Sequence, residues 1–458
     1  MNRKFQPILF SAILFLAANF SPATSSYAQQ NDTLRVMVYN VLGFGSPNNN
    51  NCQAPNQASI MPLYADLKSI IQFANADIIG LDKMQCVQTS VSDVNGISSY
   101  YFPDTVIAEC MDAVYPGRYG SCPFTDLSRC IGGSSELVFF DHNKLTYVST
   151  TPMYYGQEDF DMFKFYYNSP YMTPSTDTTY LYVILCHTIS SGTTDTGRDG
   201  EDSCVMLNVR KMFSHTPNLI YMGDFNTRTS TEAGYEYLTQ ISDTNYVLND
   251  PPFYPDAHLT YPCNWNSGNT YQAYFTTTTR STTLPNSCGT TGGAKDWYDH
   301  ILLSPWIVNG EKNLTYVRNS YTTIGNDGKR AGIDVNAGTN TSAPAAVLNA
   351  LFNFSDKYPV EVTLAVNPIL SVRNIQSDPG SIKINNPVEN GLVMHFASYL
   401  NGQNATMTIY DVCGRNLYQS VINITSSAIT KNIALVPGVY FVHFTSGGYS
   451  TTIKVVKE

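Results

Sequence analysis

The sequence predicts a layered α/β domain followed by a small all-β domain. Residues 33–40 and 77–81 are apolar and rich in β-branched side chains, and residues 61–76 between them have helical spacing. A strand–helix–strand order of this kind is typical of layered α/β domains. From residue 366 onward, short apolar runs alternate with turn residues, which indicates a small β-sandwich. A chain of 458 residues with 43% hydrophobic content is long enough for two or three domains.

Composition and charge narrow the class of protein. Charged residues make up only 14% of the chain, against about a quarter in an average protein, and there are 32 tyrosines. This profile fits a secreted, β-rich protein. The net charge of −10 argues against a large electrostatic footprint for nucleic acid. It does not exclude a nuclease, because acidic residues that hold metal ions neutralise a bound phosphate locally.

Residues 1–28 are expected to be a secretory signal peptide. Met1-Asn2-Arg3-Lys4 is basic, and the apolar run at 8–20 is too short to span a membrane. Ser26-Tyr27-Ala28 supplies small residues before the expected cleavage point. No later run is apolar and long enough to cross a bilayer, so no integral membrane segment is expected after signal removal.

The cysteines of an exported chain suggest disulfide bonds. Nine of the ten cysteines lie between Cys52 and Cys288, so at least one of these nine has no partner within that region. Spacing does not fix the pairing. The short loops that could close are Cys122 with Cys130, Cys186 with Cys204, and Cys263 with Cys288.

The remaining elements of the first domain follow from periodicity and turn residues. The helix at 61–76 is expected to bury five apolar side chains: Leu63, Leu67, Ile70, Ile71 and Phe73. A weak helix is expected at 201–213. Residues 87–132 are rich in loops and cysteines, and residues 250–293 are expected to form a long surface loop that shapes a substrate cleft. Further strands are expected at 136–145, 179–187, 219–222, 295–303 and 354–362.

The stretch at 219–227 is the centre of the candidate site. Its apolar run predicts a buried strand that stops at Gly223, where glycine lets the backbone turn. Because side chains alternate along a strand, Asp224 and Asn226 are expected to point the same way. A carboxylate beside a carboxamide at the mouth of a sheet suits a metal-assisted phosphate site. The ordinary alternative is an Asx turn that closes a loop.

Five motifs in order resemble the endonuclease/exonuclease/phosphatase superfamily, whose fold is that of deoxyribonuclease I. They are Asn40 after the first strand, His187 after a later strand, Gly-Asp-Phe-Asn at 223–226, Asp299 in a late strand, and Ser355-Asp356. The resemblance implies a four-layer α/β sandwich of two packed sheets flanked by helices over the domain 29–365. Gly325-Asn326-Asp327-Gly328 resembles a stretch found in secreted bacterial members.

The resemblance also implies a metal site and a set of roles. Mg²⁺ or Mn²⁺ is expected on Asn40, Asp224 and Asp299, and Asn40 is expected to contact phosphate as well. In the family, the residue at Asp224 orients or deprotonates the attacking water, and the residue at Asn226 fixes that water or a phosphoryl oxygen.

Two further catalytic roles come from the same resemblance. His187 is expected to donate a hydrogen bond to the phosphate and to stabilise its charge in the transition state. In the family, the residue at Asp356 pairs with the histidine that follows it.

Two lysines depart from the family pattern. The family reads Gly-Leu-Gln-Glu where this chain has Gly80-Leu81-Asp82-Lys83, and Ser-Asp-His where it has Ser355-Asp356-Lys357. A protonated lysine cannot ligate a metal, but Lys83 and Lys357 can bind phosphate as point charges. Asp82 could replace the missing glutamate. Strand alternation sends Asp82 to the face opposite Lys83, and only a β-bulge would bring it back.

Two functions therefore stay open. One is a secreted, nuclease-like phosphodiesterase with an altered metal site, acting on nucleic acid or on another phosphodiester such as a lipid headgroup or sugar phosphate. The other is a catalytically impaired relative that needs no metal and uses its lysines to bind a phosphate-containing or other anionic ligand.

The domain at 366–458 resembles the C-terminal sorting domain of type IX secretion cargo. Asp411-Val412-Cys413-Gly414-Arg415, Leu435-Val436-Pro437-Gly438-Val439-Tyr440 and the Lys454-Val455-Val456-Lys457 tail carry the resemblance. It implies passage through the periplasm, recognition by the type IX machinery, and a secreted or cell-surface location. Strands are expected at 382–384, 392–396, 407–410, 439–444 and 451–456.

Overall fold

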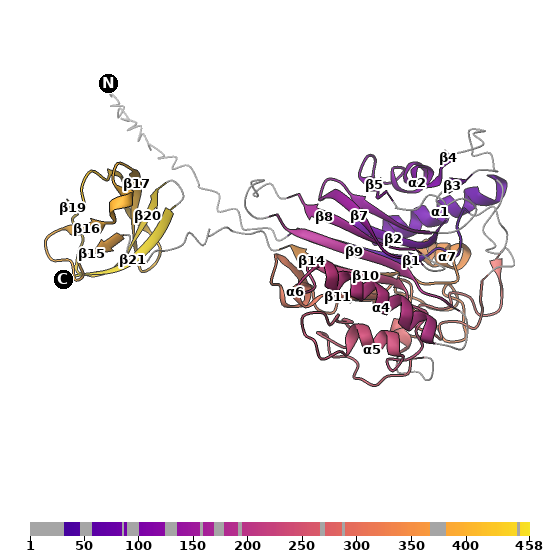
Figure 1. Cartoon of the computed structure of the whole chain (residues 1–458). Coiled ribbons are helices and arrows are strands. Elements are labelled where there is room, and N and C mark those ends of the chain that lie inside the picture. The colour runs from indigo at the N-terminus through magenta and orange to yellow at the C-terminus, as the bar shows by residue number, and fades with distance from the viewer. Residues whose placement is uncertain are drawn as a thin grey trace, which may run out of the picture. The chain divides into compact units, whose positions relative to one another are not determined.

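A computed structural model of the chain contains two compact units, which are considered separately (Figure 1). Among the described residues, the first unit covers 32–366 and the second covers 382–458. The predicted signal peptide at 1–28 lies outside the described residues. The predicted domain boundary at 365/366 lies directly before the stretch 367–381, which is also outside them. The structure describes residues 32–45, 57–84, 87–88, 100–123, 135–155, 159–168, 178–190, 195–265, 271–285, 289–366, 382–446 and 449–458.

Two β-sheets form the centre of the first unit. The larger sheet has the order β12-β14-β1-β2-β6-β5 with β13 paired to β14, and the smaller has the order β11-β10-β9-β8-β7. The pairs β1/β2 and β9/β10 are parallel, so polar residues that end these strands come together at one edge. The strands of the larger sheet are β1 (Asp32–Asn40), β2 (Ile78–Met84), β5 (Tyr119–Ser121), β6 (Ser135–Asp141), β12 (Leu314–Tyr316), β13 (Thr322–Thr323) and β14 (Val360–Val366). Those of the smaller sheet are β7 (Leu145–Tyr155), β8 (Asp159–Tyr167), β9 (Tyr180–His187), β10 (Leu219–Asp224) and β11 (Asp299–Leu303).

Helices cover the outer faces of both sheets, which gives the expected four layers. Figure 1 shows α1 and α7 on one side of the paired sheets and α4 and α5 on the other. The longer helices are α1 (Gln57–Ala74), α4 (Asp195–Met212), α5 (Ala233–Thr239) and α7 (Ala345–Phe354). Short helical turns and strands complete the unit: α2 (Phe102–Val106), the π-turn η2 (Ile107–Met111), η3 (Gln272–Tyr274), α6 (Pro305–Asn309), β3 (Val87–Gln88) and β4 (Tyr100–Tyr101).

A continuous apolar core lies between the two sheets. At Gly80 the sheets approach so closely that an added Cβ would lie 2.7 Å from the Met222 methyl and 2.9 Å from a Leu185 methyl. Leu67 and Ile70 of α1 are fully buried as predicted, but Phe73 is 38% exposed, so the predicted buried face is one residue too wide.

Three predictions of local structure in the first unit are wrong. The single strand expected at 136–145 is β6 and the start of β7, separated by a turn, and the hairpin of β7 and β8 was not predicted. Asp356 does not begin a strand, because β14 starts at Val360. The stretch 250–293 is not only a surface loop: residues 276–280 within it are buried.

Of the suggested disulfides, only Cys186 with Cys204 has both members among the described residues, and these two do not pair. Cys186 is buried in β9 and Cys204 is exposed on α4, and both are free thiols. Cys122 and Cys263, whose suggested partners lie outside the described residues, are free as well. Burial in the apolar core accounts for Cys122 and Cys186, since a buried thiol packs as a small apolar side chain.

The second unit consists of two small antiparallel sheets. Their orders are β15-β16-β19 and β18-β17-β20-β21, around a core that includes Met407, Ile409, Val442 and Phe444. Strands β18 and β19 were not predicted. The bounds are β15 (Ile382–Ile384), β16 (Leu392–Phe396), the turn η5 (Ser398–Leu400), β17 (Asn404–Asp411), β18 (Asn416–Asn423), β19 (Ala428–Lys431), β20 (Gly438–Ser446) and β21 (Tyr449–Lys457).

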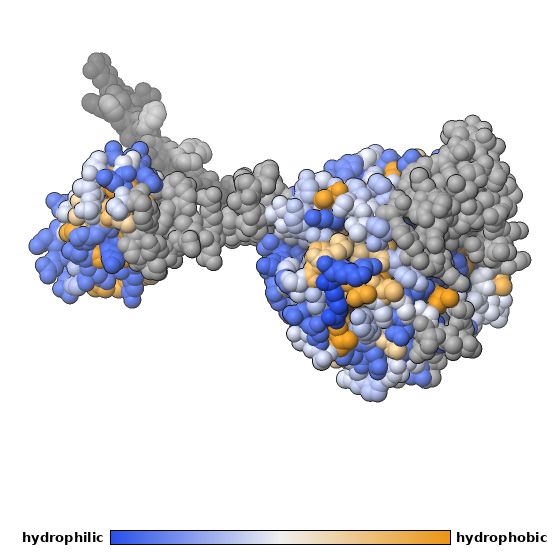
Figure 2. Space-filling view, in the orientation of Figure 1, coloured by the Kyte–Doolittle hydropathy of each residue, from blue (hydrophilic) through white to orange (hydrophobic). Residues whose placement is uncertain are grey.

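The surface of both units is largely polar on the face shown in Figure 2, with hydrophobic residues in small separate patches. In the second unit, Val412, Val421 and Val436 are well exposed. Within the described ranges, none of the helices has the length and hydropathy needed to span a membrane.

Candidate active site

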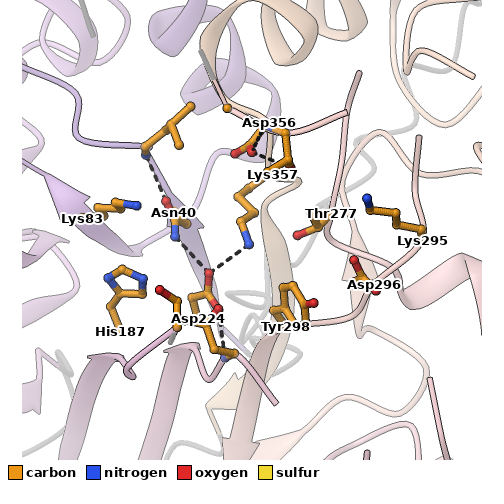
Figure 3. Close-up of a pocket in the computed structure, with 15 residues that line it drawn as sticks. Asn40, Lys83, His187, Asp224, Thr277, Lys295, Asp296, Tyr298, Asp356 and Lys357 are labelled. Carbon is orange, nitrogen blue, oxygen red and sulfur yellow. Dashed lines mark hydrogen bonds and ion pairs between the residues drawn. The ribbon is translucent and has the colours of Figure 1, made fainter. Parts of the chain in front are cut away.

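A pocket of about 520 Å³ opens where β1, β9 and β10 end (Figure 3). Asn40, His187 and Asp224 are the last residues of these strands, and strand pairing places Asp224 opposite both His187 and Asp299. The pocket is lined by Asn40, Leu42, Lys83, His187, Ser190, Asp224, Asn226, Thr277, Gly289, Thr290, Lys295, Asp296, Tyr298, Asp356 and Lys357.

Asp224 lies at the centre of the pocket and is held by three hydrogen bonds. Its Oδ2 accepts from Asn40 Nδ2 and from Lys357 Nζ, each at 3.0 Å, and its Oδ1 accepts from the Asn226 backbone N–H at 2.9 Å. Burial alone would raise the pKa of the Asp224 carboxyl, but the Lys357 ammonium, His187 and the hydrogen bonds from Lys357 and Asn226 lower it to about 2. Asp224 is therefore an anion at neutral pH and a weak base on its own.

Lys357 provides the positive charge next to this carboxylate. It is 8% exposed, and its Nζ lies 4.8 Å from the centre of the Tyr298 ring. Burial acts to lower the pKa of the Lys357 ammonium, but the carboxylates of Asp224, Asp299 and Asp356 raise it above its usual value. Lys357 is therefore a permanent cation directed at Asp224, as Figure 3 shows.

Lys83 and Asp82 are separated by a β-bulge. The pairing of β2 with β6 shifts register between Leu81 and Met84, and Lys83 has a φ of +57°. Strand alternation therefore fails here: Asp82 is fully buried in the acidic cluster, and Lys83 lines the pocket. The expectation that Asp82 faces away from the site is wrong, and the bulge is the physical reason.

Three buried carboxylates form a candidate metal site beneath the pocket. Oxygen atoms of Asp82, Asp224 and Asp299 all lie within 4.8 Å of one another. Within the described part of the chain, neither carboxylate oxygen of Asp82 and neither of Asp299 has a hydrogen-bond partner. Burial and the neighbouring carboxylates raise the pKa of both groups well above the usual value.

The donor chemistry of this cluster fits a divalent cation. Mg²⁺ and Mn²⁺ prefer carboxylate oxygens, and these oxygens are buried without other partners. The three carboxylates outnumber the Lys357 ammonium by two, which is the charge of one divalent ion. Without such an ion, burial and the neighbouring carboxylates favour the neutral forms of Asp82 and Asp299, since they raise the pKa of both groups.

The structure places the other predicted site residues as follows. Asn226 has a φ of +49°, and its Nδ2 donates to the Thr188 carbonyl at 2.7 Å, which fixes its amide in the pocket. Asp356 lies outside the acidic cluster. Its Oδ2 accepts hydrogen bonds from the backbone N–H and the hydroxyl of Thr290, so Asp356 holds the loop that forms one wall. Asn40 donates from Nδ2 to Asp224, and its Oδ1 accepts from the Leu42 N–H.

Sequence reasoning missed the wall opposite Lys83 and His187. Figure 3 shows Thr277, Lys295, Asp296 and Tyr298 on that side. Lys295, Asp296 and Tyr298 lie within four residues of Asp299 in the sequence. Their nearness to a predicted site residue could have indicated that they line the pocket. Thr277 follows no strand pattern and could not have been found this way.

His187 is buried and neutral at physiological pH. Burial lowers the pKa of its imidazole to about 4, Lys83 and Lys357 act in the same direction, and Asp224 opposes them. A neutral imidazole can still donate one hydrogen bond, which is the role predicted for this residue.

The lowered pKa of His187 predicts a loss of stability in acid. An unfolded histidine has a pKa of about 6.5, so the unfolded chain binds more protons than the folded protein between about pH 6.5 and pH 4. The stabilisation is complete above pH 6.5 and is lost as the pH falls to 4, with a total on the order of 3 kcal/mol. Urea unfolding across this range should show a steeper decline for the wild type than for His187→Asn. Equal slopes in the two proteins would contradict the assignment.

Comparisons with known proteins bear on each unit separately. Residues 385–458 match the secretion system C-terminal sorting domain, which confirms the resemblance seen at this end of the chain. This sorting domain indicates export by the type IX route, to the medium or the cell surface. No curated protein matches the chain.

Solved structures similar to this chain include endonuclease/exonuclease/phosphatase enzymes. The human Nocturnin catalytic domain with bound sulfate is 14% identical, with a TM-score of 0.42 over 74% of this chain and 98% of that one. D. rerio TDP2 complexed with a single-strand DNA product is 14% identical, with a TM-score of 0.44 over 73% and 100%. An endonuclease/exonuclease/phosphatase from Bacteroides vulgatus is 12% identical, with a TM-score of 0.41 over 73% and 100%.

Proposed function

We propose that the first unit is a secreted phosphodiesterase that hydrolyses nucleic acid or a related phosphodiester with the help of a divalent cation. The observation that carries this proposal is the cluster of Asp82, Asp224 and Asp299 directly beneath a pocket lined by cationic side chains. Buried carboxylates without hydrogen-bond partners are costly unless they are protonated or bind a cation.

The residues of the pocket have complementary roles in this reaction. Asp82, Asp224 and Asp299 would hold Mg²⁺ or Mn²⁺, which when bound polarises a phosphoryl oxygen and activates water. Lys357 keeps Asp224 ionised, and Asn40 fixes the orientation of that carboxylate.

Two further residues act on the substrate side of the pocket. His187 donates a hydrogen bond to a non-bridging phosphate oxygen, where negative charge increases in the transition state. Asn226, held by Thr188, orients the attacking water or a phosphoryl oxygen.

A second candidate function is supported by one contact. The Lys357 Nζ forms an ion pair with Asp224 Oδ2 at 3.0 Å. An ammonium group at that position repels a metal ion. A protein in which Lys357 takes the place of the cation would bind an anionic ligand in the pocket without hydrolysing it.

Metal titration of the full chain distinguishes the two functions. We expect MgCl₂ or MnCl₂ to bind in calorimetry and to support plasmid cleavage in the same buffer. Asp82→Asn and Asp299→Asn should each weaken metal binding at least about tenfold and abolish cleavage, because each removes a ligand charge.

The matched control is Asp243→Asn, which changes a partly exposed aspartate that pairs with Arg210 and is not part of the metal cluster. This substitution should change neither readout. Cleavage that survives in Asp299→Asn would contradict the metal assignment. A wild-type protein that neither binds metal nor cleaves would favour the anion-binding function.

A further inference from the structure

Lys83 has a backbone conformation that lysine rarely adopts. Its φ of +57° lies in the left-handed region, where a side chain with a Cβ is disfavoured and glycine is not. Two backbone hydrogen bonds hold the chain in this shape: the Val41 N–H donates to the Asp82 carbonyl at 3.0 Å, and the Gly43 N–H donates to the Lys83 carbonyl at 2.7 Å. Non-glycine residues in strained conformations cluster at binding and catalytic sites.

The strained conformation has a definite consequence for the pocket. It directs Asp82 into the buried acidic cluster while the next residue, Lys83, lines the pocket. Leu42 and Asn226 also line the pocket with positive φ values of 54° and 49°. A glycine at position 83 would allow the same bulge without strain, so the presence of lysine requires another explanation.

The ammonium group of Lys83 is available to a ligand. Lys357 is paired with Asp224, and Lys295 Nζ donates to the Thr291 carbonyl at 2.9 Å. By contrast, Lys83 forms no ion pair or side-chain hydrogen bond with any residue that the structure describes. Figure 3 places Lys83 on the same wall of the pocket as His187, and its charge contributes to the lowered pKa of that imidazole.

We propose that Lys83 is an anion anchor that holds a phosphate-type tetrahedral anion in the pocket without a metal ion. The choice of phosphate rests on the proposed function, but the anchor does not depend on hydrolysis. Lys83 supplies the charge, and the neutral His187 beside it can supply a second hydrogen bond to the same anion. Lys357 neutralises Asp224 below, which removes the repulsion that this carboxylate would otherwise exert on the anion.

Phosphate binding in the presence of EDTA tests the anchor directly. We expect inorganic phosphate to bind the full chain in calorimetry under these conditions. Lys83→Gly and Lys83→Met should each weaken binding about tenfold to a hundredfold, the usual effect of losing one charged hydrogen bond. Lys312→Met, which removes an exposed lysine that stacks on Trp306, is the control and should leave the affinity unchanged.

Thermal unfolding separates the charge of Lys83 from its backbone strain. Lys83→Gly should raise the unfolding midpoint by roughly 1–4 °C because it relieves the strain, whereas Lys83→Met should not. Unchanged phosphate affinity in Lys83→Gly, or no binding by the wild type in EDTA, would overturn the anchor. Phosphate binding without Mg²⁺-dependent cleavage would refute the proposed hydrolase and leave the anchor standing.

Discussion

Gly223→Ala is expected to destabilise the first unit strongly. Gly223, near the end of the interior strand β10, is paired in parallel register with Cys186 and has a φ of +145°. An added Cβ would lie 1.8 Å from the Cys186 carbonyl oxygen and 2.7 Å from its carbonyl carbon. A clash with backbone in a central strand cannot be relieved by side-chain rotation. We expect a loss of at least about 4 kcal/mol and a fall of at least about 10 °C in the unfolding midpoint.

Gly332→Ala is the matched control for this substitution. Gly332 also has a positive φ of 69°, but no atom lies within 4 Å of an added Cβ. Only the backbone conformation opposes the substitution there, at a cost of about 1–2 kcal/mol. Equal losses in the two variants, measured by calorimetric unfolding, would show that φ rather than the Cys186 contact determines the requirement for glycine.

The requirement for glycine at position 223 also made the position of Asp224 predictable from sequence. An apolar run that ends in Gly-Asp indicates both the buried strand and the turn that places Asp224 at the strand end. Asn40 and His187, at the ends of β1 and β9, were assigned to the site through the resemblance of their motifs to the endonuclease/exonuclease/phosphatase superfamily. Parallel pairing then brings strand ends together whatever the intervening loops do.

Asp82 was misplaced because its orientation depends on tertiary contacts. Alternation is a local rule, and it fails where the Val41 and Gly43 N–H groups bond to the carbonyls of Asp82 and Lys83. Nothing in residues 78–84 alone indicates these bonds. The hairpin of β7 and β8 was missed for a related reason: its residues mix tyrosine, threonine and charge without a long apolar run, and pairing with β9 stabilises them.

Lys357→Met is expected to lower the stability of the folded protein, and a divalent cation bound to the acidic cluster is expected to restore it. In EDTA, removing the ammonium leaves Asp224 as a buried carboxylate beside Asp82 and Asp299. Breaking one partner of a buried pair costs about 3–5 kcal/mol, and Asp224 should respond with a pKa raised well above the value of about 2 that it has beside the lysine. Urea unfolding in EDTA measures the loss.

Excess MgCl₂ should recover much of this stability, because an ion that binds only the folded protein stabilises it by mass action. Lys144→Met is the matched control: its Nζ lies 3.2 Å from both Asp77 and Asp32, but the lysine side chain is 27% exposed. That substitution should cost less than about 1 kcal/mol and show no dependence on Mg²⁺.

The stability that Mg²⁺ adds to the wild type, compared with the stability that it adds to Lys357→Met, also distinguishes the two candidate functions. If the wild type gains as much stability from Mg²⁺ as the variant does, Lys357 and the metal ion occupy the site together, as the proposed hydrolase requires. If only the variant gains, the ammonium occupies the place of the ion in the wild-type protein, and the pocket is one that binds anions without hydrolysing them. If neither protein responds to Mg²⁺, Asp82 and Asp299 are protonated acids rather than metal ligands.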